Sequence, residues 1–278
     1  MKQKTIAVLG AGMMGQAILK GLIATGHPKR LLRATTRTKS AGAQLSKSLG
    51  VSVSTDTIAA VSGAGIVVLA LKPMTLPHVL AELADAKALR KGTILISIAA
   101  GVTTGSIGEI VGDYVPVVRA MPNTPCSIGR GMTVLSRGRS AGESHVAMAR
   151  KIFEPLGRIL ELEEKHMNTV TGLSASGPAF VYVIIEALAD GAVARGLPRG
   201  TAIEMAAQMV YGAASMVLET GRHPAALKDD VTTPAGCTIA GILALEDGRI
   251  RSVLSRAVEV ASVRAGELGK REKTESDS

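Results

Sequence analysis

A glycine loop between a short strand and a helix is the feature that most constrains how this chain can fold. The loop, Gly10-Ala11-Gly12-Met13-Met14-Gly15, follows the β-branched run Thr5–Leu9 and precedes a helical pattern. With 31 glycines in the chain a GxGxxG match alone says little, but a strand before it and a helix after it are what a dinucleotide-binding fold requires. In that fold Gly10 permits a tight turn, Gly12 lets the backbone approach a pyrophosphate, and Gly15 lets the helix pack closely on the strand. We therefore expect nucleotide phosphates at the N-terminus of this helix.

The first half of the chain continues as alternating strands and helices. Further strands are predicted at residues 31–37, 51–53, 65–71, 93–98 and 115–121, with a helix at 40–49 and helical intervals between most of the others. Several of these strands are apolar on both faces, as parallel strands covered by helices are. The pattern predicts an α/β fold with a doubly wound parallel sheet of the Rossmann type.

From about residue 165 the pattern changes to long helices. Residues 176–195 and 199–220 are rich in Ala, Met, Leu and Val at helical spacing, and Gly196-Leu197-Pro198 separates them. We therefore predict a dinucleotide-binding domain at residues 1–163 and an all-helical domain at 164–270. A flexible polar tail is predicted at 271–278.

The basic charge of the chain is concentrated at its start. The net charge is +9, and residues 1–50 contain nine Lys and Arg but no Asp or Glu. A nucleic-acid-binding protein is one interpretation, but the chain has no Trp, three Tyr and two Phe, so few aromatic side chains could stack on bases. A smaller anion is the alternative that the glycine loop favours.

The end of the second predicted strand indicates which dinucleotide binds. A site for NAD normally has Asp or Glu about 20 residues after the loop, where it binds the ribose 2′-OH. Here the strand ends at Thr35, Thr36 and Arg37, and no carboxylate occurs before Asp56. Hydroxyls and a guanidinium suit a 2′-phosphate. We predict NADPH as the preferred cofactor and leave NADH open as a second one.

Two other predicted strand ends belong to the same edge of the sheet. They are Ala70-Leu71-Lys72-Pro73 and the segment Ser97–Gly101. Ligands of open α/β sheets bind outside the carboxyl ends of the strands. Lys72 could meet ribose or phosphate oxygens there, and the small residues before Gly101 would let a flat ring approach.

A polar, glycine-rich stretch interrupts the helices of the second half. Residues 229–241 contain Thr233-Pro234, an arrangement that predicts a helix start. Backbone N–H groups around Gly236–Thr238 would form a cradle for a carboxylate, with the Thr238 hydroxyl inside it. An ordinary capped helix is the alternative interpretation.

Together these motifs resemble the pyrroline-5-carboxylate reductase family of proline biosynthesis. The resemblance covers about residues 5–268. It rests on GAGMMG at 10–15, ALKP at 70–73, SIAAG at 97–101, RAMPNTP at 119–125, TGLSASGPAF at 171–180, GLPR at 196–199 and HPAALKDDVTTPAGCTIAGI at 223–242. The stretches at 171–180 and 223–242 are the most specific of these.

The resemblance implies a Rossmann-type domain followed by a helical substrate and dimerisation domain. It implies NAD(P)H-dependent reduction of 1-pyrroline-5-carboxylate to L-proline, by hydride transfer to the ring C=N. It assigns cofactor binding to Gly10, Ala11, Gly12, Met13, Met14, Gly15, Thr35, Thr36, Arg37, Leu71, Lys72, Pro73, Ala99, Ala100 and Asp230. It assigns substrate binding to Glu164, Thr233, Gly236, Cys237 and Thr238, with Thr238 as the candidate catalytic residue at the ring nitrogen. No metal is expected.

The resemblance also implies a homodimer formed by interlocked C-terminal helices, with assembly of the dimers into a decamer as a further option. Cys126 and Cys237 are too few for a disulfide framework and fit free thiols in a reducing cytosol. No secretory pattern opens the chain, and the longest apolar run, Ile66–Leu71, is far below the roughly 20 residues of a membrane span. We therefore expect a cytoplasmic enzyme that acts on a small molecule, with no nucleic-acid or membrane partner.

The sequence is also compatible with other functions. One is a reductase of other cyclic imines, or an enzyme similar to β-hydroxyacid dehydrogenases, although residues 171–190 lack the helical Lys of that second family. Another is a catalytically inactive dinucleotide sensor. The chain also departs from the family pattern at Ala235, where a second glycine is usual, and at Thr57, where an Asn is frequent.

Overall fold

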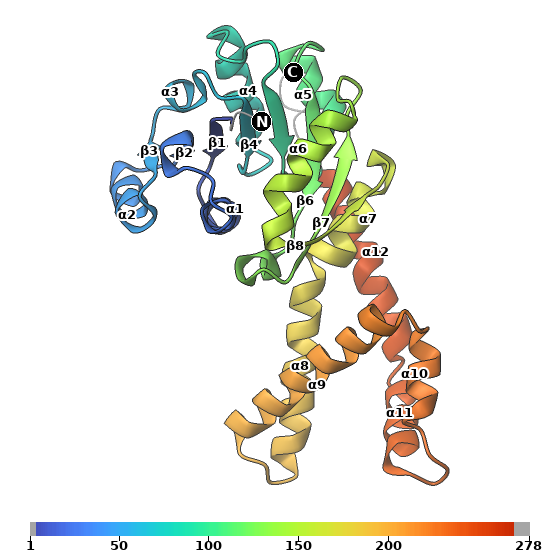
Figure 1. Ribbon diagram of the computed structural model, residues 1–278. Helices are drawn as coiled ribbons and strands as arrows, with labels where there is room; N and C mark the ends of the chain where they lie inside the picture. Colours follow the sequence, from blue (N-terminus) through green and yellow to red (C-terminus); the bar gives the residue numbers. More distant parts are fainter. Residues whose placement is uncertain (1–3, 270–278) are drawn as a thin grey trace, which may run out of the picture. The chain divides into compact units, whose positions relative to one another are not determined.

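The computed structural model describes residues 4–269, whose contacts define two compact units (Figure 1). Unit 1 contains the chain up to Ser176 together with the segment from Glu259 onward, and unit 2 is Gly177–Val258. The predicted tail at 271–278 lies outside the described residues. The predicted boundary between residues 163 and 164 stays a prediction, because sequence pattern and compactness divide a chain by different criteria.

Unit 1 is built on an eight-stranded sheet. Its strands are β1 (Ile6–Leu9), β2 (Leu32–Thr35), β3 (Ser52–Ser54), β4 (Ile66–Leu69), β5 (Ile94–Ser97), β6 (Val117–Met121), β7 (Gly131–Arg137) and β8 (Gly157–Glu161). Their order in the sheet is β3-β2-β1-β4-β5-β6-β7-β8. The chain runs outward from β1 to β3 on one side and from β4 on the other, so the order reverses between β1 and β4. Doubly wound folds bind nucleotides at such a reversal.

Helices cover both faces of this sheet. The helices α1 (Met13–Ala24), α2 (Lys39–Leu49) and α6 (Glu143–Phe153) pack on one face, and α3 (Thr57–Val61), α4 (Leu76–Asp85) and α5 (Thr104–Val111) pack on the other. In Figure 1, α6 crosses in front of β6 and β7. Because side chains alternate along a strand, Val8 belongs to one core and Leu9 to the other, and both are fully buried. The predicted α/β doubly wound fold is confirmed.

The last two strands differ from the prediction of a parallel sheet. The strand β7 runs antiparallel to β6, and β8 runs parallel to β7. Neither strand was predicted, and nor was α6. Unit 1 also contains shorter helical segments: η1 (Lys29–Leu31) before β2, and η2 (Thr124–Ile128), η3 (Glu154–Leu156), η4 (Glu164–His166), α7 (Met167–Val170) and the π-helical η5 (Thr171–Ala175) in its later part.

Unit 2 is entirely helical in its regular structure. It contains α8 (Gly177–Ala194), α9 (Arg199–Thr220), α10 (Pro224–Asp230), α11 (Cys237–Asp247) and the first part of α12 (Ile250–Leu268), whose end belongs to unit 1. The two long helices predicted from their apolar spacing are therefore confirmed. They bury very little, since the buried residues are Ala189 in α8 and Ala202 and Ala206 in α9.

One helical run is long and apolar enough to cross a membrane by length and composition alone. It is the 31-residue run Glu164–Ala194, whose most apolar window is almost entirely exposed. The expectation of no membrane partner rested on the length of uninterrupted apolar runs, and this run is interrupted by glycine, serine and threonine. Such a helix is a weak indication of a membrane, because a helix covered by a partner subunit has the same composition.

Candidate nucleotide and substrate sites

The glycine loop connects β1 to α1, and a different physical reason explains why glycine occupies each of its three motif positions, 10, 12 and 15. Gly10 has a φ of +87°, and a Cβ there would lie 2.6 Å from the Ala70 carbonyl oxygen. A Cβ on Gly15 would lie 2.6 Å from the Gly10 carbonyl oxygen, so the approach of helix to loop requires glycine. Around Gly12 no heavy atom lies within 4 Å of a Cβ position. Packing thus explains Gly10 and Gly15, and the open space at Gly12 fits a pyrophosphate.

The N-terminus of α1 has the features of an anion-binding site. Its N-cap residue is Gly12, which supplies no side-chain cap, and the first turn contains no acidic residue. Met13 is 68% exposed, so this end of the helix is open to solvent. Free N–H groups and the positive end of the helix dipole favour phosphate at this position.

Thr35, at the end of β2, supports the loop from behind. The Gly10 N–H donates to Thr35 Oγ1 at 3.0 Å, and the Ala11 N–H donates to the Thr35 carbonyl oxygen at 2.8 Å. Thr35 is only 6% exposed, whereas Arg37 is exposed. Between them, the Thr36 hydroxyl donates to the Thr38 carbonyl oxygen at 3.0 Å. The loop and the segment predicted to bind the 2′-phosphate are therefore neighbours.

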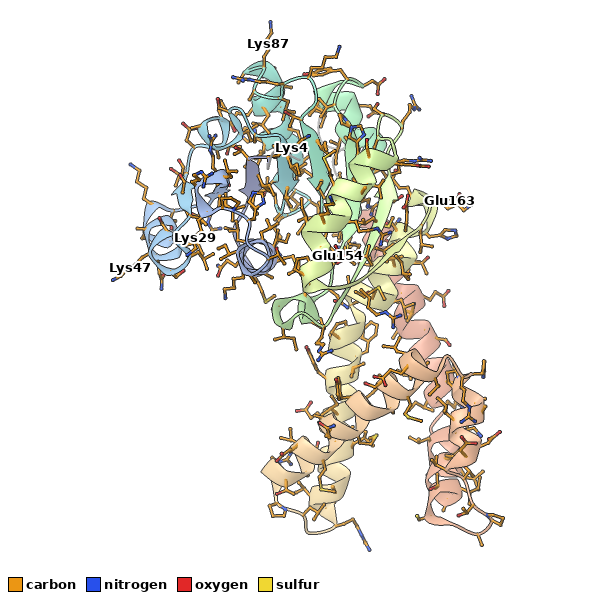
Figure 2. The ribbon with its side chains drawn as sticks, in the orientation of Figure 1. Lys4, Lys29, Lys47, Lys87, Glu154 and Glu163 are labelled. Carbon is orange, nitrogen blue, oxygen red and sulfur yellow. The ribbon has the colours of Figure 1, made fainter. Side chains whose placement is uncertain are left out.

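The described basic side chains of the first 50 residues lie mostly at the surface of unit 1. Lys29, Arg30, Arg37, Lys39 and Lys47 are exposed, and the ion pairs within residues 4–269 all lie after residue 118. In Figure 2, Lys47 extends from the outer end of unit 1. Of the exposed basic side chains in this group, Arg37 and Lys39 lie at the cofactor edge, where β2 ends and α2 begins.

The carboxyl ends of β4 and β5 complete this edge. Leu71, Lys72 and Pro73 follow β4, and the Lys72 carbonyl oxygen accepts from the Thr75 N–H at 3.0 Å, which turns the chain into α4. Ala99 and Ala100 follow β5; Ala99 is buried and Ala100 is half-buried. Because β1, β2, β4 and β5 are parallel, these predicted cofactor residues gather at one edge of unit 1.

Glu164 belongs to η4 in unit 1 and its carboxylate is already engaged there. Its Oε1 accepts from the Thr104 N–H at 2.7 Å, and its Oε2 accepts from the Thr104 hydroxyl at 2.6 Å. It also pairs with Arg119, whose Nη1 lies 3.5 Å from Oε1. Burial lowers the pKa of Arg119, and the carboxylate of Glu164 opposes that shift. A contact of Glu164 with substrate stays a prediction.

The other predicted substrate residues gather in unit 2, at the start of α11. Gly236 is the N-cap, no side chain caps the helix, and Cys237 and Thr238 form its first turn. The expected start at Thr233-Pro234 is wrong: the helix begins three residues later. The cause is a turn in which the Gly236 N–H donates to the Thr233 carbonyl oxygen at 3.1 Å and Ala235 has a φ of +59°. This turn leaves the first N–H groups of α11 free.

Asp230, the remaining predicted cofactor residue, ends α10. Its Oδ2 accepts from Arg222 Nη1 at 2.6 Å, and this hydrogen bond holds the pKa of the Asp230 carboxyl below its usual range. The side chain is exposed and stays ionised. Among residues 4–269 no three His, Cys, Asp or Glu side chains are grouped as metal ligands would be. The expectation that no metal takes part stays a prediction.

A glycine loop at the reversal of a doubly wound sheet, with an open helix N-terminus beside it, defines a dinucleotide-binding oxidoreductase of the Rossmann type. Residues 5–101 match the family model of F420-dependent NADP oxidoreductases, and residues 164–268 match that of pyrroline-5-carboxylate reductase dimerisation. A pyrroline-5-carboxylate reductase of Glycine max is 42% identical over 265 residues, covering 95% of this chain and 96% of that protein. The chain belongs to the pyrroline-5-carboxylate reductase family.

Solved structures agree with this membership. A pyrroline-5-carboxylate reductase from Coxiella burnetii superposes with a TM-score of 0.88 at 35% identity, over 96% of this chain and 99% of that chain. The pyrroline carboxylate reductase of Plasmodium falciparum, solved with NADP bound, has a TM-score of 0.87 at 29% identity, over 97% of this chain and 99% of that chain. The likeness thus extends over both units.

Three polar residues of unit 1 had no predicted role: Thr104, Arg119 and Asn168. Arg119 opens the RAMPNTP motif, so its position was noted but its function was not. The signal in the sequence is a charged residue within an otherwise apolar strand, Val117–Met121. Its partner Glu164 lies 45 residues away, so only the fold reveals the pair.

Proposed function

We propose that this chain reduces 1-pyrroline-5-carboxylate to L-proline with NADPH as the preferred hydride donor, the last step of proline biosynthesis. The observation that carries the proposal is the match to pyrroline-5-carboxylate reductases at up to 42% identity over nearly the whole chain. NADH stays open as a second cofactor. Reduction of other cyclic imines, or oxidation of a 3-hydroxyacid by an enzyme similar to β-hydroxyacid dehydrogenases, is the alternative.

The residues at the sheet edge fit NADPH. The N–H groups of Met13 and Met14 would hold the pyrophosphate over Gly12, and Arg37 would pair with the 2′-phosphate. Lys72 and Pro73 would lie along the ribose and phosphates, and Ala99 and Ala100 along the nicotinamide. When bound, the dihydronicotinamide supplies a hydride from its C4. Asp230 is proposed to reach the cofactor from the helical region.

The residues at the start of α11 fit the substrate carboxylate. The N–H groups of Cys237 and Thr238 are free, and the Thr233 hydroxyl lies in the turn before them. A carboxylate held there would leave the Thr238 hydroxyl for the ring nitrogen. The C=N bond is most electrophilic when protonated, and an unperturbed hydroxyl is a poor acid. We therefore assign Thr238 to orienting and hydrogen-bonding the ring rather than to supplying the proton.

The helical region is proposed to form a homodimer through interlocked C-terminal helices, and the dimers are proposed to assemble into a decamer. The exposed apolar run Glu164–Ala194 would then be covered by a partner subunit instead of lipid. We propose a cytoplasmic location and no nucleic-acid partner.

The proposed reaction is tested by following NADPH oxidation with 1-pyrroline-5-carboxylate and with other cyclic imines, and NADP+ reduction with 3-hydroxyacids. Thr238→Ala should lower kcat/KM by roughly tenfold to a thousandfold, or about 1.4–4 kcal/mol of transition-state stabilisation. Thr232→Ala is the matched control, because that hydroxyl donates to the Lys228 carbonyl oxygen at 2.6 Å and is already engaged. Unchanged kinetics in Thr238→Ala would refute the role of this residue, and a wild type inactive on the imine would refute the reaction.

A further inference from the structure

A row of buried polar side chains crosses three strands beside the proposed nicotinamide site. Arg119 of β6 is in register with Ser97 of β5 on one side and with Ser136 of β7 on the other. The three residues are 0–2% exposed. Arg119 Nε and Ser136 Oγ have no hydrogen-bond partner in the described part of the chain. The remaining guanidinium nitrogens of Arg119 therefore decide whether this buried charge is compensated.

Glu164 compensates it and at the same time reaches another element. Arg119 Nη1 lies 3.5 Å from Glu164 Oε1, and Arg119 Nη2 donates to Asn168 Oδ1 at 3.4 Å. The same carboxylate accepts both the N–H and the hydroxyl of Thr104, at 2.7 and 2.6 Å. Thr104 is the first residue of α5, where the helix dipole favours a negative charge. One carboxylate thus ties β6 to the start of α5.

The segment between β5 and α5 contains the proposed nicotinamide-binding residues. At its start the Ala99 N–H donates to Ser97 Oγ at 3.4 Å. In its middle Gly101 has a φ of +79°, and a Cβ there would lie 2.5 Å from the Ala265 carbonyl oxygen of α12. At its end Thr104 is held by Glu164. Ala100 lies between these fixed points, so the network determines the course of the loop on which it sits.

Stability alone does not account for the ion pair. An arginine buried among apolar side chains loses its hydration, and a well-packed apolar pair is often equally stable or more stable. A charged pair with directed hydrogen bonds instead selects one geometry, which is useful where atoms must be placed within a fraction of an ångström.

We propose that Arg119, Glu164 and Thr104 form a clamp that positions the loop of residues 99–101 against the nicotinamide, so that Glu164 is a positioning residue for hydride transfer. This inference rests on the proposed function, which assigns the nicotinamide to Ala99 and Ala100. Hydride transfer is sensitive to small displacements of the ring, whereas most of the affinity for NADPH comes from phosphates bound elsewhere. Loosening the clamp should therefore slow the chemical step and leave cofactor binding nearly unchanged.

The experiment compares Glu164→Gln, which keeps the shape but removes the charge, with Thr104→Val, which removes only the hydroxyl. Each should lower kcat by about tenfold or more, as small misplacements of reacting groups do, with the Kd for NADPH changed less than about threefold. The primary isotope effect with NADPH deuterated at the transferred position should rise in both, because hydride transfer becomes more rate-limiting. The double variant should lose less than the product of the two single losses, because both changes act on the same contact.

Thr103→Val is the matched control. Its hydroxyl accepts from the Ser106 N–H at 3.1 Å and caps α5 without touching Glu164, so it should lower Tm and leave kcat and the isotope effect as in wild type. If Glu164 binds substrate directly, Glu164→Gln will raise the KM for the imine while Thr104→Val stays normal, and the clamp is overturned. The clamp is also overturned if both variants lose Tm alone. A wild type that does not reduce the imine overturns the proposed function and this inference with it.

Discussion

Arg37 stands exposed where β2 ends and α2 begins, in a segment with an unbalanced positive charge. A guanidinium can bind a 2′-phosphate with two hydrogen bonds, a contact that NADH cannot make. We expect Arg37→Ala to raise the KM for NADPH by about tenfold or more, the equivalent of one charge-assisted hydrogen bond, and to change the KM for NADH little. Steady-state kinetics with both cofactors measure this.

Arg30→Ala is the control that separates a local contact from the general positive field. Arg30 is exposed in η1, before β2 begins, and so lies at the opposite end of that strand from Arg37. Its removal lowers the net charge by the same amount, so the KM for NADPH should change only slightly and the change should vanish at high salt. Equal effects of the two substitutions would mean that Arg37 acts through long-range charge alone.

Ala235 occupies a strained backbone conformation in the turn before α11. Its φ is +59°, where an L-residue with a Cβ is disfavoured by about 1–2 kcal/mol. Glycine removes this strain but is more flexible in the unfolded chain, so Ala235→Gly should raise the free energy of unfolding by about 0.5–1 kcal/mol. Urea unfolding of the two proteins measures the difference. Ala226→Gly, an exposed position inside α10, should instead lower stability by about 1 kcal/mol. A loss of stability in Ala235→Gly would contradict this account.

The limits of sequence reasoning are clear at the residue scale. The glycine loop and the Thr35–Arg37 segment follow local rules of spacing, so their place at one sheet edge could be predicted. The bonds of Glu164 to Thr104 join residues 60 positions apart, and those to Arg119 join residues 45 apart. No local sequence pattern predicts these contacts, because they form only after α5, β6 and η4 have come together.

At the scale of elements, the glycine loop between β1 and α1 contains glycines with different roles. Gly12 is expected to serve NADPH binding, and Gly15 to serve the packing of α1 on the loop. Gly12 has a φ of −72°, which any residue adopts, and open space around its Cβ position. We expect Gly12→Ala to cost less than about 1 kcal/mol of stability, chiefly through the N-cap, while weakening NADPH binding by roughly tenfold or more where the methyl meets the pyrophosphate. Fluorescence titration with NADPH and thermal unfolding measure the two effects.

Gly15→Ala should instead lower the stability of the fold more than Gly12→Ala does. Its methyl would lie 2.6 Å from the Gly10 carbonyl oxygen, which neither element can avoid without moving, so we expect a loss of about 1–3 kcal/mol of stability. Wild-type NADPH affinity in Gly12→Ala would show that the pyrophosphate does not lie over that residue.

The strands that were not predicted lie between residues 122 and 163. The strand β8 is short, carries charged residues and is mostly exposed at the sheet edge, so it lacks the apolar pattern of the inner strands. The strand β7 pairs with it from Gly131 and Gly157, which face one another in register. A side chain on Gly157 would collide with the backbone of Gly131, a requirement that arises only from pairing residues 26 positions apart. The inner strands could be predicted because burial on both faces marks them in the sequence.

At the scale of the whole molecule, the two units differ in how completely they bury their apolar side chains. The strands and helices of unit 1 enclose two cores, one on each face of the sheet. In unit 2 large apolar side chains such as Tyr182, Val183, Met209 and Leu243 are about half exposed or more. Large apolar side chains exposed in such numbers are typical of an interface. Residues 164–268 match a dimerisation family, which supports the proposal that a second copy of this chain covers this surface.

The double substitution Val183→Glu and Met209→Glu tests this interface. Val183 of α8 is 65% exposed and Met209 of α9 is 52% exposed, so neither charge disturbs a core of the single chain. In a dimer both charges would be buried, which should weaken association by about 100-fold or more, because burying unpaired charges costs several kcal/mol. Light scattering during size-exclusion chromatography should then show a smaller species than wild type at micromolar concentration.

A matched substitution in unit 1 and a vesicle-binding assay are the controls for this interface. Ile128→Glu alters a side chain that is 75% exposed in η2, and it should leave the dimer intact. If the helical run Glu164–Ala194 instead met lipid, wild type would sediment with vesicles and the double variant would not, with no change in the mass of the soluble species. A dimer that survives both glutamates would place the interface elsewhere on the helices. We expect the dimer to be lost in the double variant and kept in Ile128→Glu, because α8 and α9 expose the large apolar side chains that the proposed interface would cover.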